Sequence, residues 1–296
     1  AAKRIEALHP GSVLLLENLR FHEGEISNNL DFTGKLSYWS EAYVNDAFGT
    51  AHREHASTVG VPQELGKGAA GLLMEKELEY LSRILFDPAH PVVAVLGGAK
   101  ISDKIEIIEN LLDLVDVMLI GGGMAFNFLK VQGLEVGKSL VENDKLELAG
   151  KIIKSAMERG VVLKLPKDTV IARDCEAGAE TRTVKAEAIP KDWMGLDIGP
   201  ATVEEFAREF SRAETIIWNG PQGVFEIDEF SQGTLSVARA VAASKAFSII
   251  GGGDSVLAVM KAGVKDQINH ISTGGGACLE FLAGNKLPGV EILSDR

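Results

Sequence analysis

The stretch Phe247-Ser-Ile-Ile-Gly-Gly-Gly-Asp-Ser255 joins a short apolar run to three glycines, an acid and a hydroxyl, and the helical pattern 256–261 follows it. Three other segments repeat this order of an apolar run and then glycines, namely 92–98, 117–123 and 270–276. A strand that ends in bare backbone before a helix leaves N–H groups free at the helix start, where an anion can bind. We therefore expect the fold to be organised around four glycine turns.

The length and charge of the chain limit its class. At 296 residues it exceeds the usual domain of about 100–200 residues, so two domains, or one whole and one partial, are expected. The formal charge of −12 disfavours a nucleic-acid partner, because binding a polyanion relies on clustered Lys and Arg. Apolar runs stay below the roughly 18 residues of a membrane span, so no membrane association is expected. Two distant cysteines, Cys175 and Cys278, suit a reducing cytosol, and a cytoplasmic location is expected.

Strand and helix signals alternate from residue 91 onward. The predicted strands are 92–96, 117–120, segments within 161–172, 215–218, 247–250 and 268–272, and the predicted helices are 101–113, 124–132, 143–159, one after Pro200, 230–243, 255–262 and 277–283. The spacing of Thr202 and Glu205 predicts a capping box for the helix after Pro200. This alternation predicts an α/β fold, a parallel sheet covered by helices on both faces. The glycine turns would then meet at the carboxyl ends of the strands, where open α/β sheets bind ligands.

The N-terminal part carries weaker signals. Segments 13–16 and 42–44 are predicted strands, and a helical stretch lies between them. Leucines at helical spacing from Leu72 to Leu85 predict an amphipathic helix. The glycines at 66–68 mark a boundary before it. We expect a smaller N-terminal part, this helix, and a larger C-terminal part.

Ordinary phosphate-binding motifs are absent. Gly133-Leu-Glu-Val-Gly-Lys-Ser139 has one residue too few for a P-loop, and none of the glycine clusters completes G-x-G-x-x-G before a helix. A single glycine triplet is ordinarily a tight turn or a close packing contact, but four glycine turns at strand ends, three triplets and one pair, indicate phosphate binding. Lys100 and Lys104 are four residues apart and are expected on one helix face toward Gly97-Gly98. Two lysines at a helix start oppose the helix dipole, which favours a phosphate ligand between them.

Several polar residues allow two interpretations. Asp254 and Ser255 either cap a helix or hold a nucleotide-bound Mg²⁺ and a phosphate, and the local sequence does not choose between these roles. In the turn 218–226, Pro221 and Val224 could face a base and Glu226 could accept from ribose hydroxyls, or the turn could be purely structural.

Two further groups of side chains in the N-terminal part are ambiguous as well. Arg20 and Arg53 suit a carboxylate or phosphate ligand, with a surface ion pair as the alternative. His52 and His55 near Asp46 form a weak metal signal, and capping or core roles are preferred.

With these segments in place, the chain resembles the phosphoglycerate kinase family. The matching segments occur in family order and are 15–21, 43–53, 71–78, 96–105, 119–126, 197–200, 218–221, 223–226, 251–255 and 270–277. Gln222, where the family often has an apolar residue, and Cys278, where serine is usual, are minor departures. The resemblance covers nearly the whole chain.

The resemblance implies an α/β fold of two Rossmann-like parallel-sheet domains, each with three α/β/α layers, joined by a long interdomain helix. The implied divisions are 1–68 for an incomplete 3-phosphoglycerate-binding domain, 69–87 for the helix, 88–285 for the nucleotide-binding domain, and 286–296 for a segment returning to the first domain. The implied glycolytic activity is reversible phosphoryl transfer between 1,3-bisphosphoglycerate and ADP, giving 3-phosphoglycerate and ATP, with Mg²⁺. Since the substrates would bind on separate domains, hinge closure is expected before transfer. A monomer with small-molecule partners is expected.

Family roles carried over to matching positions define an implied site. Arg20 and Arg53 would bind phosphoglycerate. The implied catalytic residues are Lys100, Lys104, Gly275 and Gly276. The implied nucleotide-binding residues are Gly98, Lys104, Gly122, Gly123, Asn219, Pro221, Val224, Glu226, Gly252, Gly253, Asp254 and Ser255. Asp254 would hold Mg²⁺ through the nucleotide.

One departure from the family affects the expected activity. An Arg-x-Asp-x-Asn motif and a Ser-His-x-Gly-Arg-Pro segment, which the family carries in its acid-binding domain, do not occur in these 296 residues. The resemblance therefore implies that roughly the N-terminal third of the N-terminal domain or more is not represented, and little activity is expected. The alternative is a catalytically incompetent nucleotide-binding fragment. An unrelated dinucleotide oxidoreductase is disfavoured, because G-x-G-x-x-G is absent.

Overall fold

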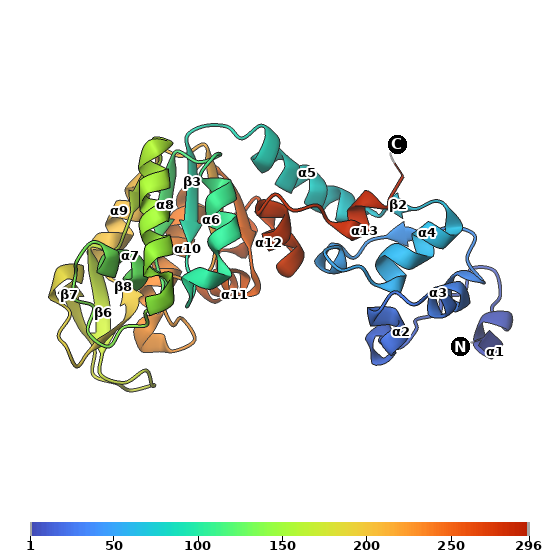
Figure 1. Ribbon diagram of the computed structural model, residues 1–296, viewed down its shortest axis with the longest axis horizontal. Helices are drawn as coiled ribbons and strands as arrows, with labels where there is room; N and C mark the ends of the chain where they lie inside the picture. Colours follow the sequence, from blue (N-terminus) through green and yellow to red (C-terminus); the bar gives the residue numbers. More distant parts are fainter. Residues whose placement is uncertain (1, 295–296) are drawn as a thin grey trace. The chain divides into compact units, whose positions relative to one another are not determined.

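The computed structural model describes residues 2–294 and divides into two compact units (Figure 1). Unit 1 combines Ala1–Leu78 with Asn285–Arg296, and unit 2 is Glu79–Gly284. Helix α5 (Leu72–Phe86) carries the chain from unit 1 into unit 2. Within the described residues, the helices are all too short or too polar to cross a membrane.

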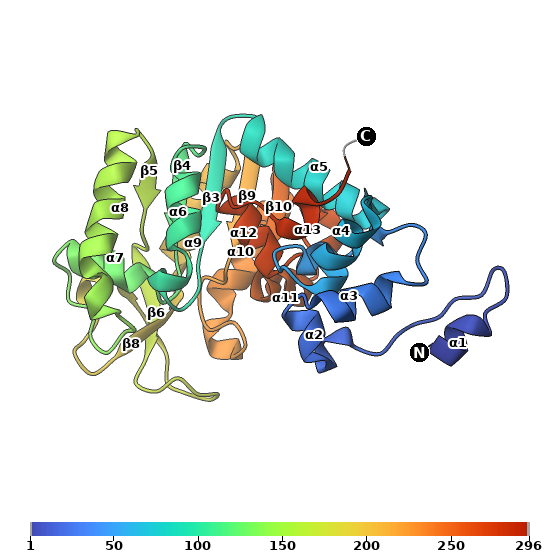
Figure 2. The same ribbon diagram turned by 45° about the vertical axis from the view of Figure 1, so that its right-hand side comes forward.

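A six-stranded parallel sheet forms the centre of unit 2, in the order β11-β10-β9-β3-β4-β5. Figure 2 shows β5, β4, β3, β9 and β10 following one another across the unit. The strands are β3 (Val92–Leu96), β4 (Val117–Ile120), β5 (Val162–Lys164), β9 (Thr215–Asn219), β10 (Phe247–Gly251) and β11 (His270–Ile271). The chain starts at β3, builds β4 and β5 on one side, and then returns to build β9, β10 and β11 on the other. The strand order therefore reverses between β3 and β9, where α/β sheets open a ligand crevice.

Helices cover both faces of this sheet. They are α6 (Ile105–Leu111), α7 (Ala125–Val131), α8 (Leu146–Glu158), α9 (Pro200–Phe210), α10 (Gln232–Ala243), α11 (Gly253–Ala262) and α12 (Gly276–Leu282). Figure 1 shows α6 and α8 in front of the strands and α9 and α10 behind them. On the face of α9 to α11, Phe206, Trp218 and Val237 are completely buried in one apolar cluster. Burial on both faces explains why β3, β4, β9 and β10 are largely apolar runs and were predictable from sequence.

A second, antiparallel sheet of three strands completes unit 2. Its order is β7-β6-β8, with β6 (Asp168–Ala172), β7 (Arg182–Lys185) and β8 (Met194–Ile198). Only β6 lies within a predicted strand region. Strand β7 is a largely exposed edge with two basic residues, and β8 contains Gly195 and Asp197, residue types that strands usually lack. These two strands depend on pairing with β6, which local pattern does not reveal.

Two predicted helix features are wrong in detail. The predicted helix 101–113 begins as a 3₁₀ turn at Ile101–Asp103, and α6 starts only at Ile105, so Lys100 and Lys104 do not share an α-helical face. The predicted capping box also does not form, because the N-cap of α9 is Gly199.

The first turn of α9 is capped from a neighbouring strand instead. The carboxylate of Asp168 on β6 accepts hydrogen bonds from the backbone N–H of Ala201 at 3.0 Å and of Thr202 at 2.8 Å. A carboxylate distant in sequence thus caps this helix in place of the expected capping box. An anion at a helix start accepts hydrogen bonds from the free N–H groups and interacts favourably with the helix dipole.

Unit 1 is mainly helical, around a two-stranded parallel sheet of β1 (Val44–Asn45) and β2 (Ala69–Ala70). Its helices are α1 (Ala2–Glu6), α2 (Glu23–Ile26), α3 (Leu30–Ser37), α4 (Val61–Leu65) and α13 (Pro288–Glu291), with 3₁₀ turns at Leu19–Phe21 and Phe48–Thr50 and a π-helical turn at Ala56–Gly60. The C-terminal segment joins this unit through hydrogen bonds from Gly289 N–H to Ala51 O and from Ser294 N–H to Gly68 O, both 2.8 Å.

The predicted strand 13–16 does not form. Among the described residues, its backbone makes no hydrogen bond to a neighbouring strand. The side chains of Val13 and Leu15 are 93% and 92% exposed. An apolar run becomes a strand only where a partner strand is available, and local composition does not supply one.

Asp46 fixes the start of α5, and its loss should destabilise unit 1. Its Oδ1 accepts from Leu73 N–H at 2.7 Å and from Met74 N–H at 3.2 Å. We predict that Asp46→Ala lowers the free energy of unfolding by about 1 kcal/mol, the usual cost of a lost helix cap. Urea denaturation followed by circular dichroism measures this. The control is Glu41→Ala, an exposed acid, and an equal effect of both variants would contradict the capping role.

Candidate functional site

Three turns that leave neighbouring strands are joined by backbone hydrogen bonds. Because the strands of the main sheet are parallel, their carboxyl ends lie at one edge. There, Gly97 N–H donates to Asn219 O at 3.0 Å, Gly98 N–H to Pro221 O at 2.9 Å, and Gly122 N–H to Gln222 O at 3.0 Å. The turns after β9, β3 and β4 therefore form one continuous layer at the switch point of the sheet.

Close approach of these turns explains several glycines. A Cβ on Gly97 would lie 2.0 Å from Pro221 O, one on Gly122 would lie 2.6 Å from Gly98 O, and one on Gly123 would lie 2.7 Å from Ala99 O. Such distances exclude a side chain, and Gly122 also has a positive φ of +65°. We call Gly97, Gly122 and Gly123 the packing glycines.

Two other glycines have open space beside them. A Cβ on Gly253 at the start of α11, or on Gly275 before α12, would meet no atom within 4 Å. We call Gly253 and Gly275 the open glycines. Packing inside the protein does not require glycine at Gly253, whereas Gly275 has a φ of +48° that also favours glycine. Exposed backbone N–H groups at such positions are suited to approach by an anion.

Lys104 brings a positive charge to this edge. It precedes α6, and its Nζ donates a hydrogen bond to Asn219 Oδ1. Burial lowers the pKa of Lys104, while the nearby acids Asp103 and Asp254 act in the opposite direction. Asn219 is completely buried, and its Nδ2 has no hydrogen-bond partner among the described residues. Lys100, in contrast, is exposed and lies just before the 3₁₀ turn.

The structure separates the roles of Asp254 and Ser255. Helix α11 has Gly252 as its N-cap, without a side-chain cap, so the capping interpretation of Asp254 is wrong. Asp254 is exposed in the first turn of the helix. Ser255 is completely buried, and its Oγ accepts from Gly220 N–H at 2.6 Å. Ser255 therefore joins the start of α11 to the turn after β9.

A cavity of about 530 Å³ lies beside these turns. Its wall includes Gly98, Gly122, Gly123, Pro221, Val224, Glu226 and Asp254, together with Phe126, Lys138, Leu140, Cys175, Leu196 and Asp197. We call it the switch-point cavity. It is mostly apolar, with Glu226 and Asp254 among its few charged groups. Burial and then the charge of Glu226 raise the pKa of the Cys175 thiol.

Sequence reasoning gave no role to Phe126, Lys138, Leu140, Cys175 and Leu196 on this wall. Lys138 belongs to the segment 133–139 that fails as a P-loop, and Leu196 comes from β8, which was not predicted. Of these five residues, only Phe126 lies within a family-like segment, so the sequence carried no signal for the other four.

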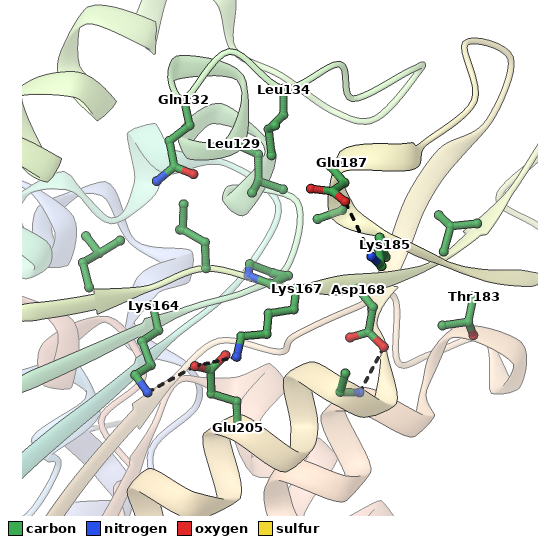
Figure 3. Close-up of a pocket in the computed structure, with 16 residues that line it drawn as sticks. Leu129, Gln132, Leu134, Lys164, Lys167, Asp168, Thr183, Lys185, Glu187 and Glu205 are labelled. Carbon is green, nitrogen blue, oxygen red and sulfur yellow. Dashed lines mark hydrogen bonds and ion pairs between the residues drawn. The ribbon is translucent and has the colours of Figure 1, made fainter.

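A second cavity of about 820 Å³ lies elsewhere in unit 2 and contains none of the glycine-turn residues (Figure 3). Its lysines are already paired, since Glu205 contacts Lys164 at 3.2 Å and Lys167 at 3.1 Å, and Lys185 contacts Glu187 at 3.7 Å. This pairing leaves no uncompensated cluster of positive charge for an anionic ligand.

Unit 1 brings Arg20 and Arg53 into electrostatic reach of one histidine. Burial lowers the pKa of His55, and the charges of Arg20 and Arg53 lower it further, against the opposing effect of buried Glu25. Both arginines are exposed, and neither side chain forms an ion pair with the described part of the chain. The surface ion-pair alternative is thus not what the structure contains.

The side chains behind the weak metal signal in unit 1 have structural roles. Asp46 caps α5, and His55 Nδ1 lies 3.9 Å from Glu25 Oε1. Across residues 2–294, no group of three or more His, Cys, Asp or Glu is placed to hold a metal ion. Any metal at the switch-point cavity would therefore need ligands from a bound molecule besides Asp254.

The parallel sheet, its switch-point cavity and the glycine turns with Lys104 and Asp254 define a nucleotide-binding protein of the α/β class. The family model for phosphoglycerate kinase matches residues 1–285. The chain belongs to the phosphoglycerate kinase family, and its function is reversible phosphoryl transfer between 1,3-bisphosphoglycerate and ADP.

Individual relatives agree with this assignment. The chain is 58% identical to the phosphoglycerate kinase of Acidobacterium capsulatum over 291 residues, covering 98% of this chain and 72% of that protein. It is 56% identical to that of Thermus thermophilus over 294 residues, covering 99% and 75%. The solved phosphoglycerate kinase of Coxiella burnetii superposes with a TM-score of 0.91 at 45% identity, over 96% of this chain and 73% of that one. The chain thus spans about three quarters of the length of these relatives.

The two kinds of glycine should respond differently to alanine. We predict that Gly97→Ala lowers the free energy of unfolding by about 1–3 kcal/mol or more, because the new methyl group meets Pro221 O. Gly253→Ala should change it by less than about 1 kcal/mol, because its Cβ meets open space. Gly253→Ala should instead weaken ADP binding about tenfold by blocking the helix start. Thermal unfolding and titration calorimetry with ADP check both variants, and unchanged ADP affinity in Gly253→Ala would count against a phosphate at this turn.

Proposed function

We propose that unit 2 binds ADP or ATP in the switch-point cavity and that unit 1 binds the phosphoglycerate. The observation that supports the nucleotide assignment most is the composition of the cavity. Its apolar wall, formed in part by Pro221 and Val224, suits a base, and Glu226 is available to accept from ribose hydroxyls. Asp254 lies on the same wall, beside the open start of α11.

The phosphate end of the site is proposed to combine backbone and lysine. Gly252, Gly253 and the first turn of α11 would donate N–H groups to the nucleotide phosphates, and Lys104 would neutralise their charge. Asn219 holds the Lys104 ammonium in place. Gly98, Gly122 and Gly123 would shape the neighbouring wall, and Ser255 would act through the turn that it fixes.

The residues present fit a nucleotide-bound Mg²⁺. Mg²⁺ is commonly held by one or two carboxylates together with substrate phosphates, and Asp254 offers one exposed carboxylate at this edge. When bound, the ion would supply positive charge to the phosphate oxygens. Phosphoryl transfer needs little covalent help from protein, so positioning and charge neutralisation by Lys100, Lys104 and the N–H groups near Gly275 and Gly276 form the proposed catalytic contribution.

In unit 1, Arg20 and Arg53 are proposed to bind the carboxylate or phosphate of 3-phosphoglycerate. Among the described residues, their guanidinium groups form no ion pair with an acidic side chain, and the charge of each lowers the pKa of His55. Planar guanidinium groups bind such oxyanions in a bidentate manner. The protein is further proposed to act in the cytoplasm as a monomer, which light scattering on the purified protein would check.

Lys104 should dominate nucleotide affinity. We predict that Lys104→Met weakens ADP binding by about ten- to a hundredfold, since a hydrogen bond to a charged group contributes about 1.5–3 kcal/mol. Burial lowers the pKa of Lys104, so ADP affinity of the unsubstituted protein should fall on the alkaline side at a lower pH than an ordinary lysine would allow. Titration calorimetry across pH tests both statements. The control is Lys151→Met, a surface lysine paired with Glu147, which should leave ADP affinity unchanged.

A polypeptide of these 296 residues is predicted to bind Mg·ADP but to form ATP at close to the background rate. The family's Arg-x-Asp-x-Asn and Ser-His-x-Gly-Arg-Pro segments, expected at the acid-binding site, do not occur in it. The measurements are ADP and 3-phosphoglycerate titrations and a coupled assay of ATP formation. Full activity would show that these motifs are dispensable, and ADP binding without 3-phosphoglycerate binding would favour the nucleotide-binding fragment.

A further inference from the structure

Asp197 is a buried carboxylate on the wall of the switch-point cavity that the proposed function leaves without a role. It lies on β8 and is 4% exposed. Its Oδ2 accepts from Gly233 N–H at 2.6 Å, and its Oδ1 accepts from Ile198 N–H at 2.9 Å. The N–H of Thr234 also donates to this carboxylate. Asp197 therefore satisfies free N–H groups in the first turn of α10, a twelve-residue helix.

The surrounding backbone leaves room for this carboxylate. A Cβ on Gly223 would lie 2.2 Å from Asp197 Oδ1, and a Cβ on Gly233 would lie 2.4 Å from the same atom. Gly223 belongs to the turn after β9, and Gly233 to the start of α10. Asp197 thus contacts both segments closely, and glycine is required on each side of it.

Two further hydrogen bonds connect this centre to the proposed nucleotide site. Gln222 N–H donates a hydrogen bond to Thr234 Oγ1 at 2.9 Å. The backbone N–H of the same residue, Thr234, donates to the carboxylate of Asp197. Val224 N–H donates to Leu196 O at 2.8 Å, one residue before Asp197. The turn that carries Val224 and Glu226 is consequently held from two sides, by α10 and by β8.

We propose that Asp197 is a positioning residue for the nucleotide. By holding the first turn of α10 against β8, it fixes the turn 221–226, whose side chains form the proposed base and ribose contacts. It acts through this turn rather than by touching the phosphates. The proposal rests on the nucleotide assignment of the switch-point cavity, and it adds a residue that fixes the geometry of that site.

The protonation state of Asp197 provides a readout of this role. Burial raises the pKa of Asp197 to about 7, against the lowering effect of the backbone N–H groups. The first turn of α10 and the turn 220–224 carry no titratable side chain. From β6, the hydroxyl of Thr169 donates a hydrogen bond to the backbone carbonyl of Asp197, and the preceding residue on β6 is the charged Asp168. The other ionisable side chains on the cavity wall are Lys138, Cys175, Glu226 and Asp254, and burial rather than one of these charges raises the pKa of Asp197. As the pH falls through about 7, the carboxylate gains a proton and offers fewer acceptor sites to the N–H groups of α10.

Asp168 supplies a matched control. Like Asp197, it lies on a strand of the antiparallel sheet, accepts N–H groups in the first turn of a helix, and faces a glycine, since a Cβ on Gly199 would lie 2.3 Å from its carboxylate. It lines the other cavity, where Figure 3 shows it near Lys167. The two carboxylates are therefore alike in structure, but Asp197 lines the switch-point cavity, whereas Asp168 lines the other cavity and only its neighbour Thr169 reaches the switch-point cavity.

The experiment compares Asp197→Asn and Asp168→Asn in a polypeptide of these 296 residues, with ADP titrations in the presence of Mg²⁺ from pH 6 to pH 8.5. An amide keeps the size of the side chain but turns one acceptor into a donor that faces N–H groups. We expect Asp197→Asn to raise the Kd for ADP about five- to fiftyfold above pH 7, in the range set by an unsatisfied buried donor. This ratio to the unsubstituted protein should shrink as the pH falls, because the unsubstituted Asp197 then becomes protonated as well. Asp168→Asn should lower thermal stability but leave the Kd unchanged at every pH.

Each outcome decides the proposal. An equal effect of both variants on the Kd, an unchanged Kd in Asp197→Asn, or a ratio independent of pH would overturn it. Absence of ADP binding by the unsubstituted protein would overturn the nucleotide assignment itself, and the proposal with it. If Asp197→Asn does not fold, Thr234→Val, which removes the acceptor of Gln222 N–H, should raise the Kd severalfold, while Thr234→Ser should restore it. An unchanged Kd in a folded Thr234→Val would then overturn the proposal.

Discussion

The hydrogen bonds between the turns after β3, β9 and β4 are the contacts on which the nucleotide half of the molecule depends. The backbones of these turns approach one another too closely for a Cβ atom at Gly97 or Gly122, so glycine is required there. This layer sets the positions of Gly98, Gly122 and Pro221 on the cavity wall, and it holds Asn219, which accepts a hydrogen bond from Lys104. Ser255 extends the layer, because its buried hydroxyl joins α11 to Gly220.

Three charged side chains lie at this edge of the main sheet, namely those of Lys104, Asp254 and Glu226. Lys104 is half-buried and its Nζ donates a hydrogen bond to Asn219, the last residue of β9, so the sheet fixes the position of its ammonium group. Asp254 and Glu226 remain exposed on the cavity wall, where a ligand can reach them. A site built in this way suits a reaction in which the protein holds and neutralises phosphate groups more than it reacts with them.

The sequence predicted the main sheet well because β3, β4, β9 and β10 are buried along almost their whole length and lead into glycine. It failed where structure depends on contacts distant in the chain. Strands β7 and β8 contain basic residues, Gly195 and Asp197, and form only by pairing with β6. The cap of α9 comes from Asp168 rather than from the expected Thr202 and Glu205. Among candidate site residues, the lysine and acid positions followed from motifs, whereas the cavity wall and the role of Asp197 required the fold.

The division between packing glycines and open glycines has a consequence for how descendants of this protein can be judged. Gly97 and Gly122 are demanded by folding, so any lineage that keeps the domain must keep them, whether or not it retains catalysis. Gly253 has no such structural requirement, since a side chain there would meet empty space. Retention of this glycine across a set of homologues would therefore indicate selection for ligand binding. Its replacement by alanine or serine would identify a lineage that has kept the fold and lost the activity.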